Sequence, residues 1–188
     1  MRRAITLASS AFFSSIFAFI FIYLMIFTSI NRAPDDMTVK MYVTANYVNK
    51  KAIKETVIND EVKAVIINFD NEDDEYYSSS LETQGLLNSD ILIIPENVFD
   101  SSDKLNSFIE IADEMFNENN SNKDEYNLLI RDEMIYGIIV YKKDLVDIFG
   151  QNIEFQNENE TYIIAINRAS KVTNKAIHTM FKLLKKSA

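Results

Sequence analysis

The chain has 188 residues and a net charge of −9 at pH 7, from 28 acidic and 19 basic residues. Such an acidic chain repels phosphate backbones, so the composition argues against a nucleic-acid-binding protein. Cysteine is absent, which excludes disulfide bonds, thiolate catalysis and cysteine-ligated zinc.

The first long segment, Ala4–Ile30, is uncharged and mostly apolar. A helix over it would be about 40 Å long, more than the roughly 30 Å hydrocarbon core of a bilayer. The run is too long for a cleaved signal peptide, has no small-residue cleavage site after it, and lacks the polar stripe of a buried core helix. We therefore predict a transmembrane anchor over residues 1–31 and a short linker over residues 32–36.

The charges that flank this segment predict its orientation. Arg2 and Arg3 precede it, whereas Arg32 is followed by Asp35 and Asp36. Positive residues favour the cytoplasmic side, so we expect a single-pass protein of the cell membrane with a cytoplasmic N-terminus and an extracytoplasmic domain over residues 37–188.

The first half of that domain alternates between strand and helix patterns. Met37–Val43 alternates apolar and polar residues and predicts a strand with one face in solvent, and Asn49 can cap a helix that runs to about Asn59. Val62–Phe69 and Asp90–Pro95 are continuously apolar, which is typical of strands covered on both faces. Between them, Tyr76–Leu87 predicts a weaker helix with a bend near Gly85.

The second half combines a hairpin with further helices. The predicted elements are a helix capped by Ser101 or Ser102 and continuing through Phe116, strands at Tyr126–Ile130 and Met134–Tyr141 joined by a turn at Arg131–Glu133, a helix at Asp144–Phe149, a strand at Tyr162–Ile166 and a helix at Val172–Lys186. The last helix has a lysine-rich face, which indicates either a solvated surface or a face that lies on anionic lipid. Together the elements predict an α/β fold with one mixed, mainly parallel sheet covered by helices.

Known catalytic motifs are absent from the sequence. With 3 glycines, a phosphate-binding glycine loop is not expected, and the single histidine, His178, falls on the lysine face of the last helix as a solvated side chain. The acidic run Asp70–Glu75 lacks the glycine and the final acid of an EF-hand, so it predicts a solvated turn, with weak calcium binding as the alternative. We predict no cofactor, no metal site and no catalytic residue.

Polar and aromatic side chains follow the predicted strands where ligands gather in open α/β sheets. The candidate ligand-binding residues are Tyr47, Asp70, Tyr76, Glu96, Asn97 and Arg168. Carboxylate, amide and aromatic groups together suit a small solute such as a sugar, through hydrogen bonds and ring stacking. The alternative is that these residues form ordinary loops at the strand ends.

Several stretches of the chain share their pattern with one known family. Val39–Asn59, Val65–Asp70, Asn88–Pro95, Met134–Lys143 and Arg168–Leu184 resemble parts of extracellular solute-binding proteins, the kind that feed ABC importers. The resemblance implies a binding fold and an ABC-type transporter as partner. It also has departures, because this chain is long enough for one lobe only and lacks the cysteine that carries a lipid anchor.

Three hypotheses for the function follow from these patterns. The first is a membrane-anchored, non-catalytic domain that binds a small solute or a transporter. The second is a structural or assembly subunit of a membrane protein complex with no small-molecule ligand. The third is an anchored hydrolase that uses Asp70 or Glu96.

Overall fold

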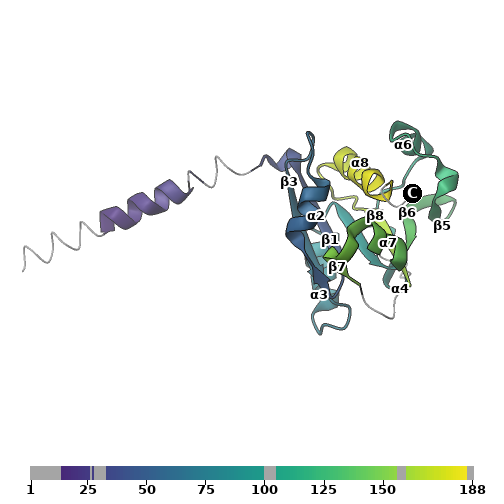
Figure 1. Ribbon diagram of the computed structural model, residues 1–188, viewed down its shortest axis with the longest axis horizontal. Helices are drawn as coiled ribbons and strands as arrows, with labels where there is room; N and C mark the ends of the chain where they lie inside the picture. Colours follow the sequence, from purple (N-terminus) through teal and green to yellow (C-terminus); the bar gives the residue numbers. More distant parts are fainter. Residues whose placement is uncertain (1–13, 26, 28–32, 100–104, 156–159, 186–188) are drawn as a thin grey trace, which may run out of the picture. The chain divides into compact units, whose positions relative to one another are not determined.

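The computed structural model describes residues 14–25, 27, 33–99, 105–155 and 160–185 (Figure 1). The chain divides into two compact units, Met1–Pro34 and Asp35–Ala188. The predicted boundary between the linker and the domain lies within two residues of this division.

In the N-terminal unit, residues 14–25 form a helix whose side chains are exposed. Most of these exposed side chains are apolar, among them Phe17, Phe19 and Phe21. Within the described part of the chain, no helix reaches the length and apolar character needed to cross a bilayer. The predicted span Ala4–Ile30 falls partly outside the described residues, since 1–13, 26 and 28–30 are not among them.

The second unit is built on one six-stranded sheet with the strand order β3-β1-β4-β8-β6-β5. Its strands are β1 (Thr38–Thr44), β3 (Ala64–Asp70), β4 (Ile91–Pro95), β5 (Asn127–Arg131), β6 (Met134–Tyr141) and β8 (Thr161–Ile166). β1 pairs in parallel with β3 and β4, whereas the pairs β4–β8, β8–β6 and β6–β5 are antiparallel. The mixed α/β sheet is confirmed, but parallel pairing is confined to the half that holds β3, β1 and β4.

A second, two-stranded sheet was not predicted from the sequence. β2 (Tyr47–Val48) pairs with β7 (Ile153–Glu154) in antiparallel register. Each strand is too short to show a two-residue alternation, so periodicity could not reveal either of them.

One face of the sheet is covered by α2 (Lys50–Val57), α7 (Lys142–Phe149) and α8 (Thr173–Leu184), whose buried side chains belong to the same core. The Asn49 side chain caps α2 by accepting a hydrogen bond from the main-chain N–H of Ala52 at 3.3 Å, as predicted. α8 buries its apolar side, including Met180 and Phe181, in the larger core. The interpretation of α8 as a helix packed on the sheet is therefore confirmed.

The opposite face is covered by α3 (Tyr77–Ser80), the π-helix η2 (Leu81–Leu86) and α4 (Glu96–Phe99). Tyr42 of β1 is buried there with Tyr77 and Leu81. The prediction that β1 has one face in solvent is therefore wrong. Of Thr38, Lys40 and Tyr42, which were expected on that face, only Lys40 is exposed. The helix predicted over Tyr76–Leu87 is confirmed, and it changes from α to π geometry along its length.

The prediction that β3 is covered on both faces is also wrong. β3 is an outer strand of the sheet, and Ile66 is 42% exposed on the face opposite α2. An apolar run cannot distinguish a strand at the sheet centre from one at its border.

The long helix predicted from Ser101 or Ser102 to Phe116 is not present in the described residues. Helix α6 is shorter (Asp113–Glu118), and Ser101 and Ser102 lie outside the described residues. Ahead of α6, Phe108 bridges to Asn167, and the N–H groups of Ile109 and Ile111 donate to Ile166 and Ile135. The chain is extended there because main-chain partners on the ends of β8 and β6 outweigh the helical spacing of the apolar residues.

The hairpin of β5 and β6 and the end of α7 match the prediction. Asp132 and Glu133 both have positive φ, at 49° and 66°, which suits the short turn between β5 and β6. α7 ends at Gly150, whose φ is 62°. The described residues of the domain also include the 3-10 turns η1 (Asp35–Met37), η3 (Lys123–Glu125) and η4 (Gly150–Asn152).

Candidate functional site

The predicted ligand-binding residues lie mainly at the end of the sheet where β1, β3 and β4 finish, called here the carboxyl end. Asp70 is the last residue of β3, with Tyr76 in the segment that follows, and Glu96 and Asn97 begin α4 after β4. Tyr47 follows β1, on β2. The structure thus brings five of the six predicted residues to one end of the sheet.

Side chains of this group form hydrogen bonds to residues next to them. Asn97 Nδ2 donates to Glu72 Oε1 at 3.4 Å, and the Asp70 carboxylate accepts the N–H of Asn71 at 3.0 Å. Tyr76 is 70% exposed and Tyr47 is 50% exposed. The described cavities of the domain are lined by other residues, so the role of this group in ligand binding stays a prediction.

Arg168 lies at the opposite end of the sheet, so its placement with the other five was wrong. β8 runs antiparallel to β4, with Ile166 opposite Ile91 at the start of β4. The residues that follow β8 therefore emerge where β4 begins. A strand pattern alone does not reveal the direction of a strand, and the prediction had treated β8 as parallel to its neighbours.

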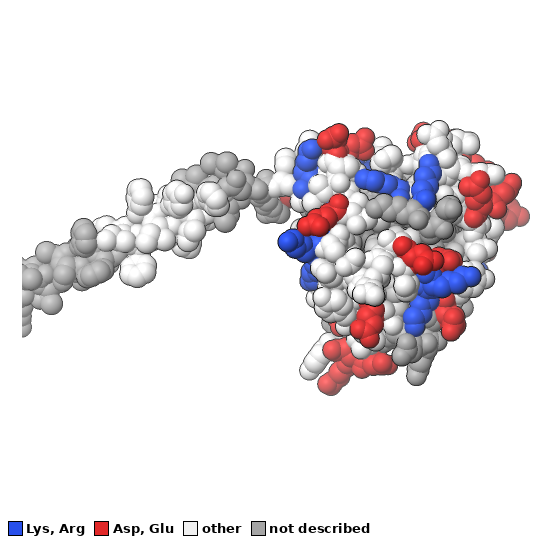
Figure 2. Space-filling model, in the orientation of Figure 1, with Lys and Arg blue, Asp and Glu red and all other residues white. Residues whose placement is uncertain are grey.

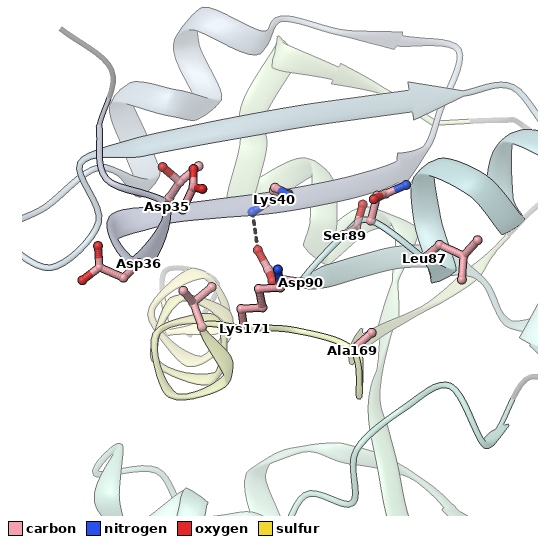
Figure 3. A pocket seen from close by; sticks show the side chains of 11 residues that line it. Asp35, Asp36, Lys40, Leu87, Ser89, Asp90, Ala169 and Lys171 are labelled. Atoms are coloured by element: carbon pink, nitrogen blue, oxygen red, sulfur yellow. Dashed lines mark hydrogen bonds between the residues drawn. The ribbon is translucent and has the colours of Figure 1, made fainter. Parts of the chain in front are cut away.

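The cavity at this opposite end is open, has a volume of about 470 Å³ and is lined by charged, polar and apolar residues (Figure 3). Its walls come from η1, the start of β1, the turn before β4 and the loop before α8. The lining residues are Asp35, Asp36, Thr38, Lys40, Leu87, Asn88, Ser89, Asp90, Ala169, Lys171 and Val172. We call it the amino-end cavity, since β1 and β4 begin there.

Asp90 joins three segments of the cavity wall. The residue is 6% exposed, and its carboxylate accepts the N–H of Lys40 on Oδ2 and the hydroxyl of Ser170 on Oδ1, both at 2.7 Å. Its own N–H donates to the Lys40 carbonyl at 2.8 Å. A buried carboxylate with charge-assisted hydrogen bonds holds its partners in a fixed arrangement.

Asn167 fixes the turn of η2 beside the same cavity. Its Nδ2 donates to the Leu86 carbonyl at 2.6 Å, and its Oδ1 accepts the N–H of Ala169 at 2.9 Å. Ser89 adds a hydrogen bond to the Gln84 carbonyl at 2.6 Å. These bonds satisfy groups at the end of the π-helix, so the wall is preorganised rather than a loose loop.

The cavity carries charges of both signs. Lys40 and Lys171 contribute ammonium groups, and in Figure 3 the Lys171 side chain extends into the cavity on the side of Asp90. Asp35 and Asp36 contribute carboxylates from η1, and Lys175 donates to the main-chain carbonyl of Asp36. Such a cavity suits a small polar ligand rather than an apolar one.

The described lining of the amino-end cavity holds carboxylates, lysines and one serine. None of its described lining residues is a histidine, and Ser89, the lining serine, donates its hydroxyl to a main-chain carbonyl. In the described ranges, no group of three or more histidines and carboxylates is arranged to hold a metal ion. His178 is exposed and lies 3.0 Å from Asn119 through Nδ1, away from the amino-end cavity.

No significant match to this chain is found among protein-family models, curated proteins or solved structures.

A buried hydroxyl cluster lies between the sheet and α3, near the carboxyl end. The Tyr77 hydroxyl is 2.9 Å from Thr44 Oγ1, and burial raises the pKa of Tyr77 far above its ordinary value. Burial also raises the pKa of Tyr42 to about 12, with Asp70 adding to the rise and the Ser80 hydroxyl opposing it. These tyrosines stay neutral at physiological pH and serve the core.

The sequence patterns had not pointed to the residues of the amino-end cavity, above all Asp90 and Lys171. Asp90 was assigned to the third strand and Lys171 to the edge of the last helix. One pattern could have pointed to them, since a carboxylate directly before a fully apolar strand is costly to bury without a partner. Its partner, Ser170, lies 80 positions away along the chain, and periodicity does not show such a contact.

Proposed function

We propose that this protein is a membrane-anchored, non-catalytic binding protein whose extracytoplasmic α/β domain takes a small polar ligand in the amino-end cavity. The N-terminal segment serves as the anchor in the cell membrane. The carboxyl-end residues Tyr47, Asp70, Tyr76, Glu96 and Asn97 remain a second place where a solute such as a sugar can bind.

The observation that carries this proposal is the amino-end cavity itself. Its volume of about 470 Å³ falls in the range of small-molecule sites, roughly 300–1,000 Å³. Its wall is held by the buried Asp90 and its hydrogen bonds to Lys40 and Ser170, so little ordering is needed when a ligand enters.

The proposal keeps the ABC-type transporter as the expected partner, on the resemblance to solute-binding proteins. A single lobe cannot close over a ligand as two lobes do, so we expect modest affinity. The alternative is a structural or assembly subunit of a membrane protein complex without a ligand. The surface of the domain carries acidic and basic side chains (Figure 2), which is also compatible with docking to another protein.

A thermal-shift screen of residues 35–188 with small polar and charged solutes tests the proposal. Both hydrophobic cores lie within this unit, so the fragment retains its full packing. A ligand at 100 times its dissociation constant is expected to raise the melting temperature by about 5–10 °C.

Two lysine variants supply the control for the screen. Lys171→Ala removes a charge from the cavity and should abolish the shift, whereas Lys143→Ala, next to the exposed Tyr141 after β6, should preserve it. The absence of any stabilising solute, together with reproducible co-purification of a membrane protein, would favour the assembly subunit instead.

A further inference from the structure

We propose that the ligand of the amino-end cavity is the headgroup of a phospholipid in the same membrane, so that the amino end of the sheet docks on the bilayer surface. This inference rests on the proposed function, because it names a ligand for the same cavity and uses the same anchor. The proposed ligand carries a phosphate together with an ammonium group, as a phosphoethanolamine headgroup does.

Chain length places the cavity near the bilayer. Asp35 and Asp36 line the cavity and are also the first residues of the domain. If the anchor ends at residue 30, only residues 31–34 connect it to the cavity rim. Four residues of fully extended chain span about 14 Å, and the headgroup layer adds further thickness beyond the hydrocarbon core. The connection therefore limits the distance between the end of the anchor and the cavity rim to about 14 Å, which allows the rim to contact the headgroup layer.

The charges of the cavity match a headgroup with both signs. Lys40 and Lys171 can receive a phosphate, and the hollow next to the cavity adds Lys175 beside Lys171. The Asp35 and Asp36 carboxylates supply the complement for an ammonium group. A bare anion would face the like charge of carboxylates in this lining, so a headgroup that carries an ammonium group beside its phosphate is the better fit.

An exposed leucine accompanies these charges. Leu87 lines the cavity in the turn before β4 and is 69% exposed. Ile66, 42% exposed, lies directly across from Lys40 in the register of β3 and β1. Single exposed apolar residues are common, but apolar side chains next to lysines at the point of tethering are the composition of a surface that rests on lipid.

The absence of tryptophan from the chain makes a direct test possible. Leu87→Trp in the full chain, reconstituted in vesicles of phosphatidylethanolamine and phosphatidylcholine, reports on contact with lipid. A phosphatidylcholine with a nitroxide on its headgroup serves as quencher. We expect the single tryptophan of this variant to show blue-shifted emission and strong quenching.

Tyr76→Trp is the matched control, since Tyr76 is 70% exposed at the carboxyl end of the sheet. Its emission should show no quenching above the level seen without nitroxide. Equal quenching of both reporters, or quenching of neither, would overturn the proposal.

A charge variant tests the headgroup itself. Lys171→Glu added to Leu87→Trp replaces the ammonium group that faces the phosphate with a carboxylate, so quenching should fall clearly below that of Leu87→Trp alone. Lys143→Glu is the control of equal charge change and should leave quenching intact. Quenching that is insensitive to Lys171→Glu would contradict headgroup binding.

Failure of this inference can be separated from failure of the proposed function. A soluble solute that stabilises residues 35–188 through Lys171, while the Leu87→Trp reporter remains unquenched, would keep the binding function and reject the lipid headgroup. Loss of the full chain from the vesicles during flotation would reject the anchor, and both proposals with it.

Discussion

Asp90 is the residue on which the amino end of the domain depends. It combines almost complete burial with hydrogen bonds to Lys40 and Ser170, and so joins β1, β4 and the loop before α8. Asp90 directly precedes β4, so its hydrogen bonds fix the start of this strand and the cavity wall together. Its neighbours Lys40 and Lys171 remain at the surface and are available to a ligand.

At the carboxyl end, the buried tyrosines predict how stability depends on pH. The pKa of Tyr42 is about 12 in the folded chain and about 10 when unfolded, so folding favours the protonated form. This stability is complete below pH 10 and is lost as the pH rises towards 12. By pH 11 the free energy of unfolding should fall by about 1.4 kcal/mol from Tyr42.

The Tyr42→Phe variant tests this pH dependence in urea denaturation of residues 35–188 between pH 9 and 11. We expect a flatter decline than in the unmodified domain, with the remainder due to Tyr77, whose pKa is raised in the same direction. Tyr141→Phe, at an exposed site, should retain the full decline. An unchanged slope in Tyr42→Phe would contradict the burial argument.

Among the elements, β6 and β8 make a close backbone approach at Gly137. A Cβ atom at this position would come within 2.7 Å of Ile163 Cγ2 and 3.0 Å of the Ile164 carbonyl oxygen. Gly137→Ala should therefore destabilise the domain by about 1–3 kcal/mol, as overpacking of a core does. Urea midpoints measure this loss, and Ile130→Val at the exposed neighbouring strand β5 should change stability by less than about 0.5 kcal/mol.

The helices, strands and turns also show which structures a local sequence pattern predicts correctly and which it does not. Asn49, Asp132–Glu133 and Gly150 each determine a local backbone geometry, so the cap, the turn and the helix end followed from the sequence. The segment before α6 has helical spacing, but its N–H groups bond to distant strands. Hydrogen bonds between residues far apart in the sequence, like those of Asp90, cannot be predicted from a short stretch of sequence.

At the scale of the whole molecule, an apolar N-terminal segment precedes an acidic α/β domain with its own cores. The fold class and most strands were predictable because short runs of apolar or alternating residues between polar segments indicate strands. The candidate ligand-binding residues stay a prediction, since five of them share the carboxyl end whereas other residues line the amino-end cavity. Strand direction decides this difference, and a single strand pattern carries no information on direction.

We propose that the N-terminal segment holds the domain in the cell membrane on its outer side. Because the chain has no cysteine, single cysteines report topology against a clean background. We would label intact cells that express Tyr141→Cys or Arg3→Cys with a membrane-impermeant maleimide and then isolate the membranes. We predict that the Tyr141→Cys protein reacts in intact cells, that the Arg3→Cys protein reacts only after permeabilisation, and that both proteins resist alkaline extraction. Recovery of the protein in the soluble fraction, or labelling of the Tyr141→Cys protein only after permeabilisation, would contradict it.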